Sequence, residues 1–575
     1  MHAKSNISKS VAILLILCLL TFLFTACGSA ANPADSEKSS ATAAASQQAT
    51  EKASPSAAAS QQATETASED GPLTPYKETV TVARPGIHWA NAKYVEGESI
   101  DDNLITRFYK EKLNIAYVNK WEVEDVKAGE KLSLAIASND LPDTFEVNAE
   151  QLGRLKNADQ IADITDAYEK YISPETRAIM EFQDKKGFVT ATFDGRYYGL
   201  PISNDFANNV AMMYIRTDWM KKFNLEAPKT LDDVISIAKT FVDKDATGTG
   251  DTIGINLDKD LGYFGVTTTL NTFANPLKAY AKIWIKDSSG NLVYGSIQPE
   301  MKTALLKMQD AYKAGIFDKE FAVKDSNKVT ELVVAGKIGI VTGEFWNPVW
   351  PFSGIPDIGK TIDFTAYPIP ANTDGKIITQ NKTFAYSWQV VRKGYANPEA
   401  IVKSMNLWRE LFHGEDSKWF NDQKSLEKYM PVREGMHMYA LPTFFSHPEK
   451  NLMLGKNMVD ALKANDPGLL ETAEGRDEWK VIKAGGGNGW GWKKMLEESE
   501  YVVLPQYTYQ YDEFLGVPTP SLLTKKAALD KLETETFVKI IMGQPIDSFD
   551  EFVKQWNDQG GKAATEEVNQ WFKSN

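Results

Sequence analysis

Short apolar runs alternate with longer amphipathic stretches from about residue 73 to the end of the chain. Runs typical of β-strands lie at residues 78–83 (ETVTVA), 209–215 (NVAMMYI) and 337–342 (KIGIVT). Amphipathic stretches with helical spacing lie between them, and strands that alternate with helices predict an α/β fold. The patterned region of roughly 500 residues is more than one hydrophobic core usually serves, so we expect two lobes.

Two of the predicted helices have clear ends. Thr230 and Asp233 match a capping box, which opens a helix with apolar residues at 234, 237, 238 and 241. A second helix carries apolar residues at 301, 305, 308 and 312 and ends at Gly315. We interpret both apolar stripes as core rather than as cofactor contacts.

The amino-terminal segment predicts export and lipid anchoring. Lys4 and Lys9 precede an apolar run over residues 11–24, which is short for a bilayer span and typical of a signal peptide. The run ends at Phe24-Thr25-Ala26-Cys27-Gly28, which resembles the bacterial lipobox. On this interpretation residues 1–26 are removed and Cys27 is lipidated; the alternative is an ordinary signal peptide with an incidental cysteine.

The stretch after Cys27 predicts a solvated tether. Residues 28–72 contain no branched aliphatic residue, methionine or aromatic residue, and AAASQQATE occurs twice, at 43–51 and 57–65. We therefore divide the chain into a signal peptide (1–26), a lipidated tether (27–73) and a folded body (74–575).

Composition excludes several classes of protein. The 63 basic and 77 acidic residues give a net charge of -14, which argues against a nucleic-acid partner. Cys18 and Cys27 are the only cysteines, so the folded body has no disulfide and no thiol chemistry. The five histidines lack the spacing of a catalytic metal site, and no G-x-S-x-G motif occurs.

One segment matches the phosphate-binding loop by letter. Residues 354–361 read GIPDIGKT, but prolines crowd the entry, Asp357 adds a negative charge, and residues 362–370 are expected to be extended rather than helical. We reject nucleotide binding on these grounds. We expect no catalytic residues, although a glycosidase with two carboxylates stays an alternative that composition does not remove.

An acidic loop predicts a structural Ca²⁺ site. Oxygen-bearing residues occupy positions 1, 3, 5, 7 and 9 of a calcium loop, with Gly248 at position 6 and Gly254 where a bidentate glutamate is usual. The expected ligands are Asp243, Asp245, Thr247, the Thr249 carbonyl and Asp251. The alternative is an acidic turn whose side chains cap nearby backbone amides.

Tryptophans next to glycine, proline or asparagine suggest a cleft lined by aromatic rings. Such rings stack on the apolar faces of sugars, while amides and carboxylates bind the hydroxyls. The candidates are Trp89, Trp346, Trp350, Trp388, Trp490 and Trp492. Residues 485–492 (GGGNGWGW) are expected to form a loop in which glycine lets the rings turn outward. For any one ring the alternative is a partly buried packing residue.

Several stretches, in their order along the chain, resemble the lipid-anchored extracellular solute-binding proteins (family 1) of bacterial ABC importers. The resemblance covers nearly all of the folded body. It rests on residues 134–143 (LAIASNDLPD), 194–201 (DGRYYGLP), 213–219 (MYIRTDW), 335–346 (AGKIGIVTGEFW), 537–543 (FVKIIMG) and 567–571 (EVNQW), together with the lipobox.

The resemblance implies a two-lobe, type II periplasmic-binding-protein-like α/β fold with a hinge. Lobe 1 would span about residues 74–202 and lobe 2 about 203–370, each with part of 371–575, and residues 366–370 would return the chain toward lobe 1. Asn204 and Asp205 would lie near the cleft floor, with Tyr197 close by, and Trp346 would stack on a sugar. The calcium loop of the family matches Asp243, Asp245, Thr247 and Asp251.

The function implied by the resemblance is capture of a carbohydrate, expected to be an oligosaccharide, outside the cell. The protein would be a monomer, held at the extracellular face of the membrane by its lipid, and would deliver the sugar to ABC permease subunits. Alternatives are a peptide or other solute as ligand, a surface-attached polysaccharide-degrading enzyme, and an adhesive lipoprotein.

Overall fold

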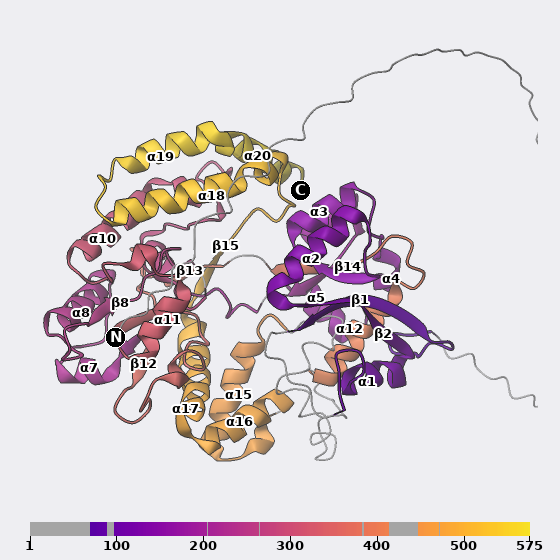
Figure 1. Cartoon of the computed structure of the whole chain (residues 1–575), viewed down its shortest axis with the longest axis horizontal. Helices are drawn as coiled ribbons and strands as arrows, with labels where there is room; N and C mark the ends of the chain where they lie inside the picture. Colours follow the sequence, from indigo (N-terminus) through magenta and orange to yellow (C-terminus); the bar gives the residue numbers. More distant parts are fainter. Residues whose placement is uncertain are drawn as a thin grey trace, which may run out of the picture. The chain divides into compact units, whose positions relative to one another are not determined.

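The computed structural model describes residues 70–88, 97–203, 205–263, 265–381, 384–412, 447–470 and 472–575, all in one compact unit (Ser68–Asn575) (Figure 1). The strands are β1 (Val80–His88), β2 (Ile115–Glu124), β3 (Thr144–Val147), β4 (Thr192–Phe193), β5 (Arg196–Tyr197), β6 (Leu200–Ser203), β7 (Met212–Arg216), β8 (Ile253–Ile255), β9 (Trp284–Lys286), β10 (Leu292–Tyr294), β11 (Ile338–Gly343), β12 (Phe364–Pro368), β13 (Ile378–Asn381), β14 (Ala385–Val391) and β15 (Thr508–Tyr511).

Helices surround these strands, and none within the described residues is both long and apolar enough to cross a bilayer. They are α1 (Leu104–Leu113), α2 (Asp125–Ser138), α3 (Ala149–Asn157), α4 (Thr165–Tyr171), α5 (Pro174–Met180), α6 (Phe182–Lys185), α7 (Thr217–Lys222), α8 (Leu231–Asp243), α9 (Thr269–Ala274), α10 (Pro299–Lys313), α11 (Ser326–Val334), α12 (Glu399–Phe412), α15 (Lys450–Ala464), α16 (Ala473–Ala484), α17 (Gly486–Lys494), α18 (Pro520–Ile541), α19 (Ser548–Trp556) and α20 (Lys562–Ser574).

The two largest sheets of the described residues have three and four strands, and four further sheets have two strands each. One has the order β3-β14-β6, with β14 antiparallel to both neighbours. The other has the order β12-β7-β11-β8, in which β11 is antiparallel to β7 and parallel to β8. The mixed α/β architecture predicted from the alternating pattern is therefore confirmed.

Hydrophobic cores form on both sheets. Around the first sheet, α1, α4, α5 and α12 bury residues such as Phe108, Tyr168 and Trp408. Around the second sheet, α8 and α10 pack with the carboxyl-terminal α18 and α19, which bury Phe537 and Trp556 in the same core (Figure 1). Segments from the end of the chain thus complete a core that begins more than 200 residues earlier, at β7.

The well-punctuated elements form where the sequence predicts them. The Thr230 hydroxyl accepts from the Asp233 backbone N–H at 3.1 Å, and the Asp233 carboxylate accepts from the Thr230 N–H at 2.9 Å, which is the predicted capping box of α8. Gly315 takes a φ of 75° just after α10, where a left-handed residue stops the helix. Residues 364–368 are extended after the rejected phosphate-loop match, as β12.

Two expectations differ from the structure. Residues 366–370 do not return the chain to the first sheet, because β12 pairs with β7; the change of sheet occurs between β13, which pairs with β15, and β14. Residues 486–494 form helix α17 instead of a loop. The physical reason is close packing: a Cβ on Gly491 would approach the Pro348 carbonyl oxygen to 2.4 Å, so glycine here lets a helix pack tightly.

Candidate functional site

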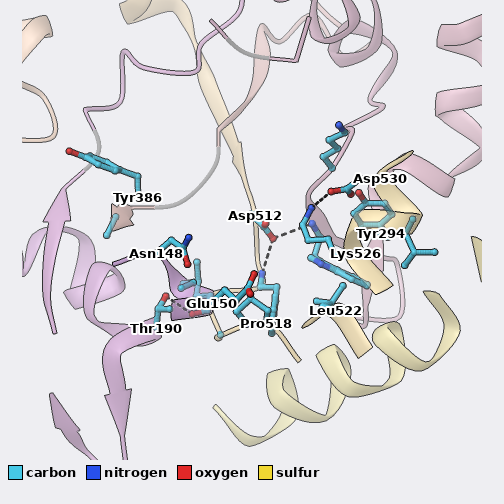
Figure 2. Close-up of a pocket in the computed structure, with 18 of the residues that line it drawn as sticks. Asn148, Glu150, Thr190, Tyr294, Tyr386, Asp512, Pro518, Leu522, Lys526 and Asp530 are labelled. Atoms are coloured by element: carbon cyan, nitrogen blue, oxygen red, sulfur yellow. Dashed lines mark hydrogen bonds and ion pairs between the residues drawn. The ribbon is translucent and has the colours of Figure 1, made fainter. Parts of the chain in front are cut away.

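A cavity of about 380 Å³ lies at the carboxyl end of β3 (Figure 2). Its walls come from residues 148–150, 282–294, 385–388 and 512–530, with Thr190 and Trp556. The Thr190 hydroxyl donates to the Leu515 carbonyl oxygen at 2.7 Å and ties two of the lining segments together. Because a concave site lined by aromatic rings with a few convergent polar groups is the usual setting for a bound small molecule, this cavity is a candidate binding site.

The rim of the cavity is fixed by the start of α3. Asn148 follows β3 directly, and its side-chain oxygen accepts from the Gln151 N–H at 2.9 Å. In return the Gln151 side chain accepts from the Asn148 N–H at 3.0 Å. This reciprocal cap holds Asn148 and Glu150 at the edge of the cavity, where Figure 2 shows them.

Aromatic rings form much of the wall. Tyr294 and Trp556 stack with ring centroids 5.0 Å apart, and Trp284 packs 5.3 Å from Tyr294. These three rings are buried, whereas Tyr386 is 53% exposed. Apolar ring faces can stack on a sugar ring, and the few polar groups beside them can bind its hydroxyls.

Asp512 supplies the most constrained polar group of the cavity. Its Oδ1 accepts from the Trp284 N–H at 3.1 Å and from the Phe514 N–H at 3.0 Å. Its Oδ2 has no hydrogen-bond partner among the described residues, and the side chain lines the cavity (Figure 2). Burial raises the pKa of Asp512 to about 7, although the two backbone hydrogen bonds oppose that rise. One oxygen is therefore anchored and the other is available to a ligand hydroxyl.

A second candidate feature follows β11. Trp346 and Trp350 stack with centroids 6.1 Å apart and ring planes 25° from parallel, and Trp350 is 51% exposed. The Trp346 indole N–H donates to the buried Glu344 carboxylate at 3.1 Å, which fixes the inner ring. An exposed ring held by a stacked partner is suited to contact a ligand.

Trp490 and Trp492 are not the freely projecting loop rings that the sequence suggested. The Trp490 indole N–H donates to Asp363 at 3.1 Å, and the ring packs so closely on Gly359 that a Cβ there would lie 2.6 Å from it. Trp492 is partly buried against the core of the second sheet. Both belong to helix α17, which restricts their movement.

Other predicted ligand residues are built into the fold. Trp388 lines the cavity but is only 3% exposed, and its indole N–H donates to the Gly187 carbonyl at 2.9 Å. Tyr197 packs 4.6 Å from Phe188 beside the core of the first sheet. Asp205 is buried and accepts from the Ala207 and Asn451 N–H groups at 2.8 and 3.2 Å. Trp89, Asn204 and Cys27 lie outside the described residues.

The acidic loop after α8 is satisfied by its own polar groups. Asp245 accepts from the hydroxyls of Thr247 and Thr252 at 3.0 and 2.9 Å. Asp243 pairs with Lys239, and Asp251 pairs with Lys337 at 2.9 Å. Within the described part of the chain, no three His, Cys, Asp or Glu residues are grouped to hold a metal ion.

Of the residues that line the cavity, the sequence predicted Trp388 as a ligand contact but did not predict Asp512. The residues that line the cavity come from four distant segments and two single positions, Thr190 and Trp556, and no local motif marks Asp512. The sequence signal that does exist is weak: a run of alternating tyrosines, residues 507–511, indicates a strand whose end Asp512 follows.

Comparison with known proteins identifies relatives across most of the chain. Residues 91–408 match the model of the family described as bacterial extracellular solute-binding protein. Lipoprotein LipO of Bacillus subtilis (strain 168) is 24% identical over 482 residues, which cover 79% of this chain and 85% of the relative. The fructooligosaccharide ABC transporter substrate-binding protein FusA of Streptococcus pneumoniae is 27% identical over 355 residues, 58% of this chain and 59% of that one.

Solved structures show the same fold. An extracellular solute-binding protein from Bifidobacterium longum subsp. infantis superposes with a TM-score of 0.60 at 16% identity, covering 86% of this chain and 98% of its own. S. pneumoniae FusA in complex with kestose gives a TM-score of 0.59 at 17% identity, covering 86% of this chain and 99% of its own. The chain therefore belongs to the bacterial extracellular solute-binding proteins, as its sequence predicted, and it is a binding protein rather than an enzyme.

Proposed function

We propose that this protein binds an oligosaccharide outside the cell and delivers it to the permease subunits of an ABC importer. The observation that carries the proposal is the cavity at the end of β3, where buried aromatic rings surround an Asp512 carboxyl with one unpartnered oxygen. Two relatives are named for saccharides: FusA for fructooligosaccharide, and YtcQ of B. subtilis for polygalacturonan and rhamnogalacturonan.

The proposed mechanism is capture by closure. A saccharide that contacts residues carried by both sheets is bound more tightly when the sheets close on it, so binding shifts the population toward the closed form. No covalent step is involved. Anchoring through Cys27 would keep the protein at the extracellular face of the membrane, and a relative is itself named a lipoprotein.

A ligand screen tests the proposal directly. Residues 68–575, the compact unit in which buried Lys403 keeps its partner Asp70, are heated with oligosaccharides from plant and microbial polysaccharides, and each hit is recovered and analysed by chromatography. A saccharide that raises the melting temperature and returns intact is the expected result, since a ligand that binds only the native state stabilises it. A rise in melting temperature with peptides alone would show that the ligand is a peptide and not a sugar. Recovery of a cleaved saccharide would contradict a role limited to binding.

Trp350→Ala is expected to lower the affinity for the saccharide that the screen selects about two- to tenfold, while the protein stays folded. The ring is half exposed and stacked on Trp346, and loss of one stacking ring removes about 0.5–1.5 kcal/mol. Isothermal titration calorimetry measures the change. Tyr501→Ala, which removes another exposed ring from a different surface, is the control. If Trp350→Ala and the unmodified protein bind the saccharide with equal affinity, Trp350 does not contact the ligand.

Calcium binding is a separate proposal, supported by the spacing of Asp243, Asp245, Thr247, Thr249 and Asp251 and by a relative whose solved structure is described as an EF-hand mutant. Because Lys337 holds Asp251 and Lys239 holds Asp243, Ca²⁺ must displace both ammonium groups. We expect Lys337→Ala to bind Ca²⁺ more tightly than the unmodified chain in calorimetry after chelation. No heat from either protein at millimolar Ca²⁺ would contradict the site.

A further inference from the structure

More acidic than basic side chains line the cavity. Three carboxyl side chains, Glu150, Asp512 and Asp530, line it together with the ammonium group of Lys526 (Figure 2). Lys282 adds a second ammonium group. A uronate would bring a further carboxylate into this space. Whether the cavity accepts it depends on how many of the cations are free to pair with it.

Each cation near the cavity already has a partner. Lys526 forms an ion pair with Asp530 one turn further along α18. Arg154 forms an ion pair with Glu150 at 2.8 Å, so its guanidinium group is paired with the carboxylate at the rim of the cavity. Lys282 places its ammonium 3.8 Å from the centroid of the Tyr263 ring, and its charge acts on the buried Glu533. A ligand carboxylate would have to break one of these arrangements.

The unpartnered oxygen in the cavity belongs to an acid. Asp512 Oδ2 can accept a hydrogen bond from a sugar hydroxyl, because Oδ1 alone takes both backbone N–H groups. A sugar hydroxyl donates to a carboxylate, whereas a second carboxylate beside it repels it. The buried aromatic walls around Asp512 contribute no charge of either sign.

We propose that this cavity takes an uncharged saccharide unit and discriminates against uronates. The inference rests on the proposed function and adds to it the charge class of the substrate. It separates this chain from relatives whose names or titles mention galacturonan or alginate.

The test compares saccharides that differ only in charge. Calorimetry is run at pH 8.5, where Asp512 is ionised, on the compact unit of residues 68–575. The ligand pairs are α-1,4-galactotetraose and tetragalacturonate, β-1,4-mannotetraose and tetramannuronate, and cellotetraose and tetraglucuronate, in which a carboxylate replaces each hydroxymethyl group. If the screen selects another saccharide, that compound and its C6-oxidised form make a fourth pair. The expected result is at least tenfold weaker binding of the uronate than of its neutral partner, because like charges placed together repel each other.

Two variants connect the discrimination to the cavity. Asp512→Asn keeps the Oδ1 that accepts both N–H groups but removes the charge of the side chain. Asp530→Asn releases the Lys526 ammonium group. Each substitution should reduce the ratio of the affinity for the neutral saccharide to the affinity for its uronate about two- to fivefold. Glu535→Gln is the control, because it releases Lys531 and Lys539 from i,i+4 pairs on α18 outside the cavity.

The outcomes separate the two proposals. A uronate that binds as tightly as its neutral partner overturns the charge preference and leaves the saccharide-binding function standing. An unchanged ratio in both cavity variants, or an equal change in Glu535→Gln, shows that the discrimination arises elsewhere and overturns the assignment to this cavity. No binding of any saccharide, neutral or acidic, overturns the proposed function and this inference with it.

Discussion

Lys450→Met is expected to lower the free energy of unfolding by about 3 kcal/mol at pH 7.5, the lower end of the range for breaking a buried ion pair. Lys450 opens α15 and donates to Glu474 at 2.7 Å, with each side chain only about one-quarter exposed (23% and 25%). Burial lowers the pKa of Lys450, but the carboxylates of Glu474 and Asp205 outweigh it, so the net shift is upward. Because its pKa is raised, Lys450 itself stays protonated from pH 5 to 8, so any change of the loss within this range comes from its carboxylate partners.

The pH dependence of this loss identifies its cause. Burial raises the pKa of Asp205 to about 6, so this carboxyl is largely protonated at pH 5 and needs the lysine less. We therefore expect the loss measured by urea unfolding to be smaller at pH 5 than at pH 7.5. Lys302→Met is the control: its partners Asp547 and Asp550 are 87% and 66% exposed, so the free energy of unfolding should fall much less in this variant than in Lys450→Met. Equal losses in the two variants would show that the Lys450 cluster is solvated.

The parts of the fold that the sequence predicted are those whose signal is local. The capping box at Thr230, the strands β7 and β11, and the stop at Gly315 each depend on a few adjacent residues. The glycine-rich stretch before Trp490 was predicted to be a loop but forms the start of helix α17, because glycine serves both in turns and in closely packed helices. Gly485 and Gly486 take positive φ values at the turn, while Gly487 and Gly491 allow a helix to approach its neighbours closely.

The candidate site was harder to predict because it is assembled by tertiary contacts. Asp512, Lys282 and Asn148 meet around one cavity, although they are more than 100 residues apart in sequence. The calcium loop shows the reverse problem, since its spacing is local but the ion pairs of Lys239 and Lys337 depend on the folded surroundings. Spacing alone therefore indicates which oxygen atoms are near one another and not whether they are free to bind an ion.

Glu500 is the most isolated buried acid of the described residues. It has no exposed surface, and neither carboxyl oxygen has a hydrogen-bond partner within the part of the chain that the structure describes. It projects from the π-helical turn at Met495–Val503 toward Gly455 on α15, where a Cβ would come within 2.7 Å of the Glu500 Cβ. Burial raises the pKa of Glu500 well above its usual value, and nearby Glu478 adds to the rise while Lys450 opposes it.

Glu500→Gln is expected to stabilise the protein at neutral pH and to leave it nearly unchanged at pH 4.5. A carboxyl whose pKa is higher in the folded state binds more protons there, so unfolding becomes easier as pH rises above the unfolded pKa of about 4.3. One such proton removes about 1.4 kcal/mol of stability per pH unit while the folded carboxyl stays protonated. Urea unfolding between pH 4.5 and 8 should therefore show a shallower decline in the variant than in the unmodified protein. Glu551→Gln, which changes an exposed carboxylate on α19, should keep the original slope; the same slope in all three proteins would show that Glu500 ionises within the fold.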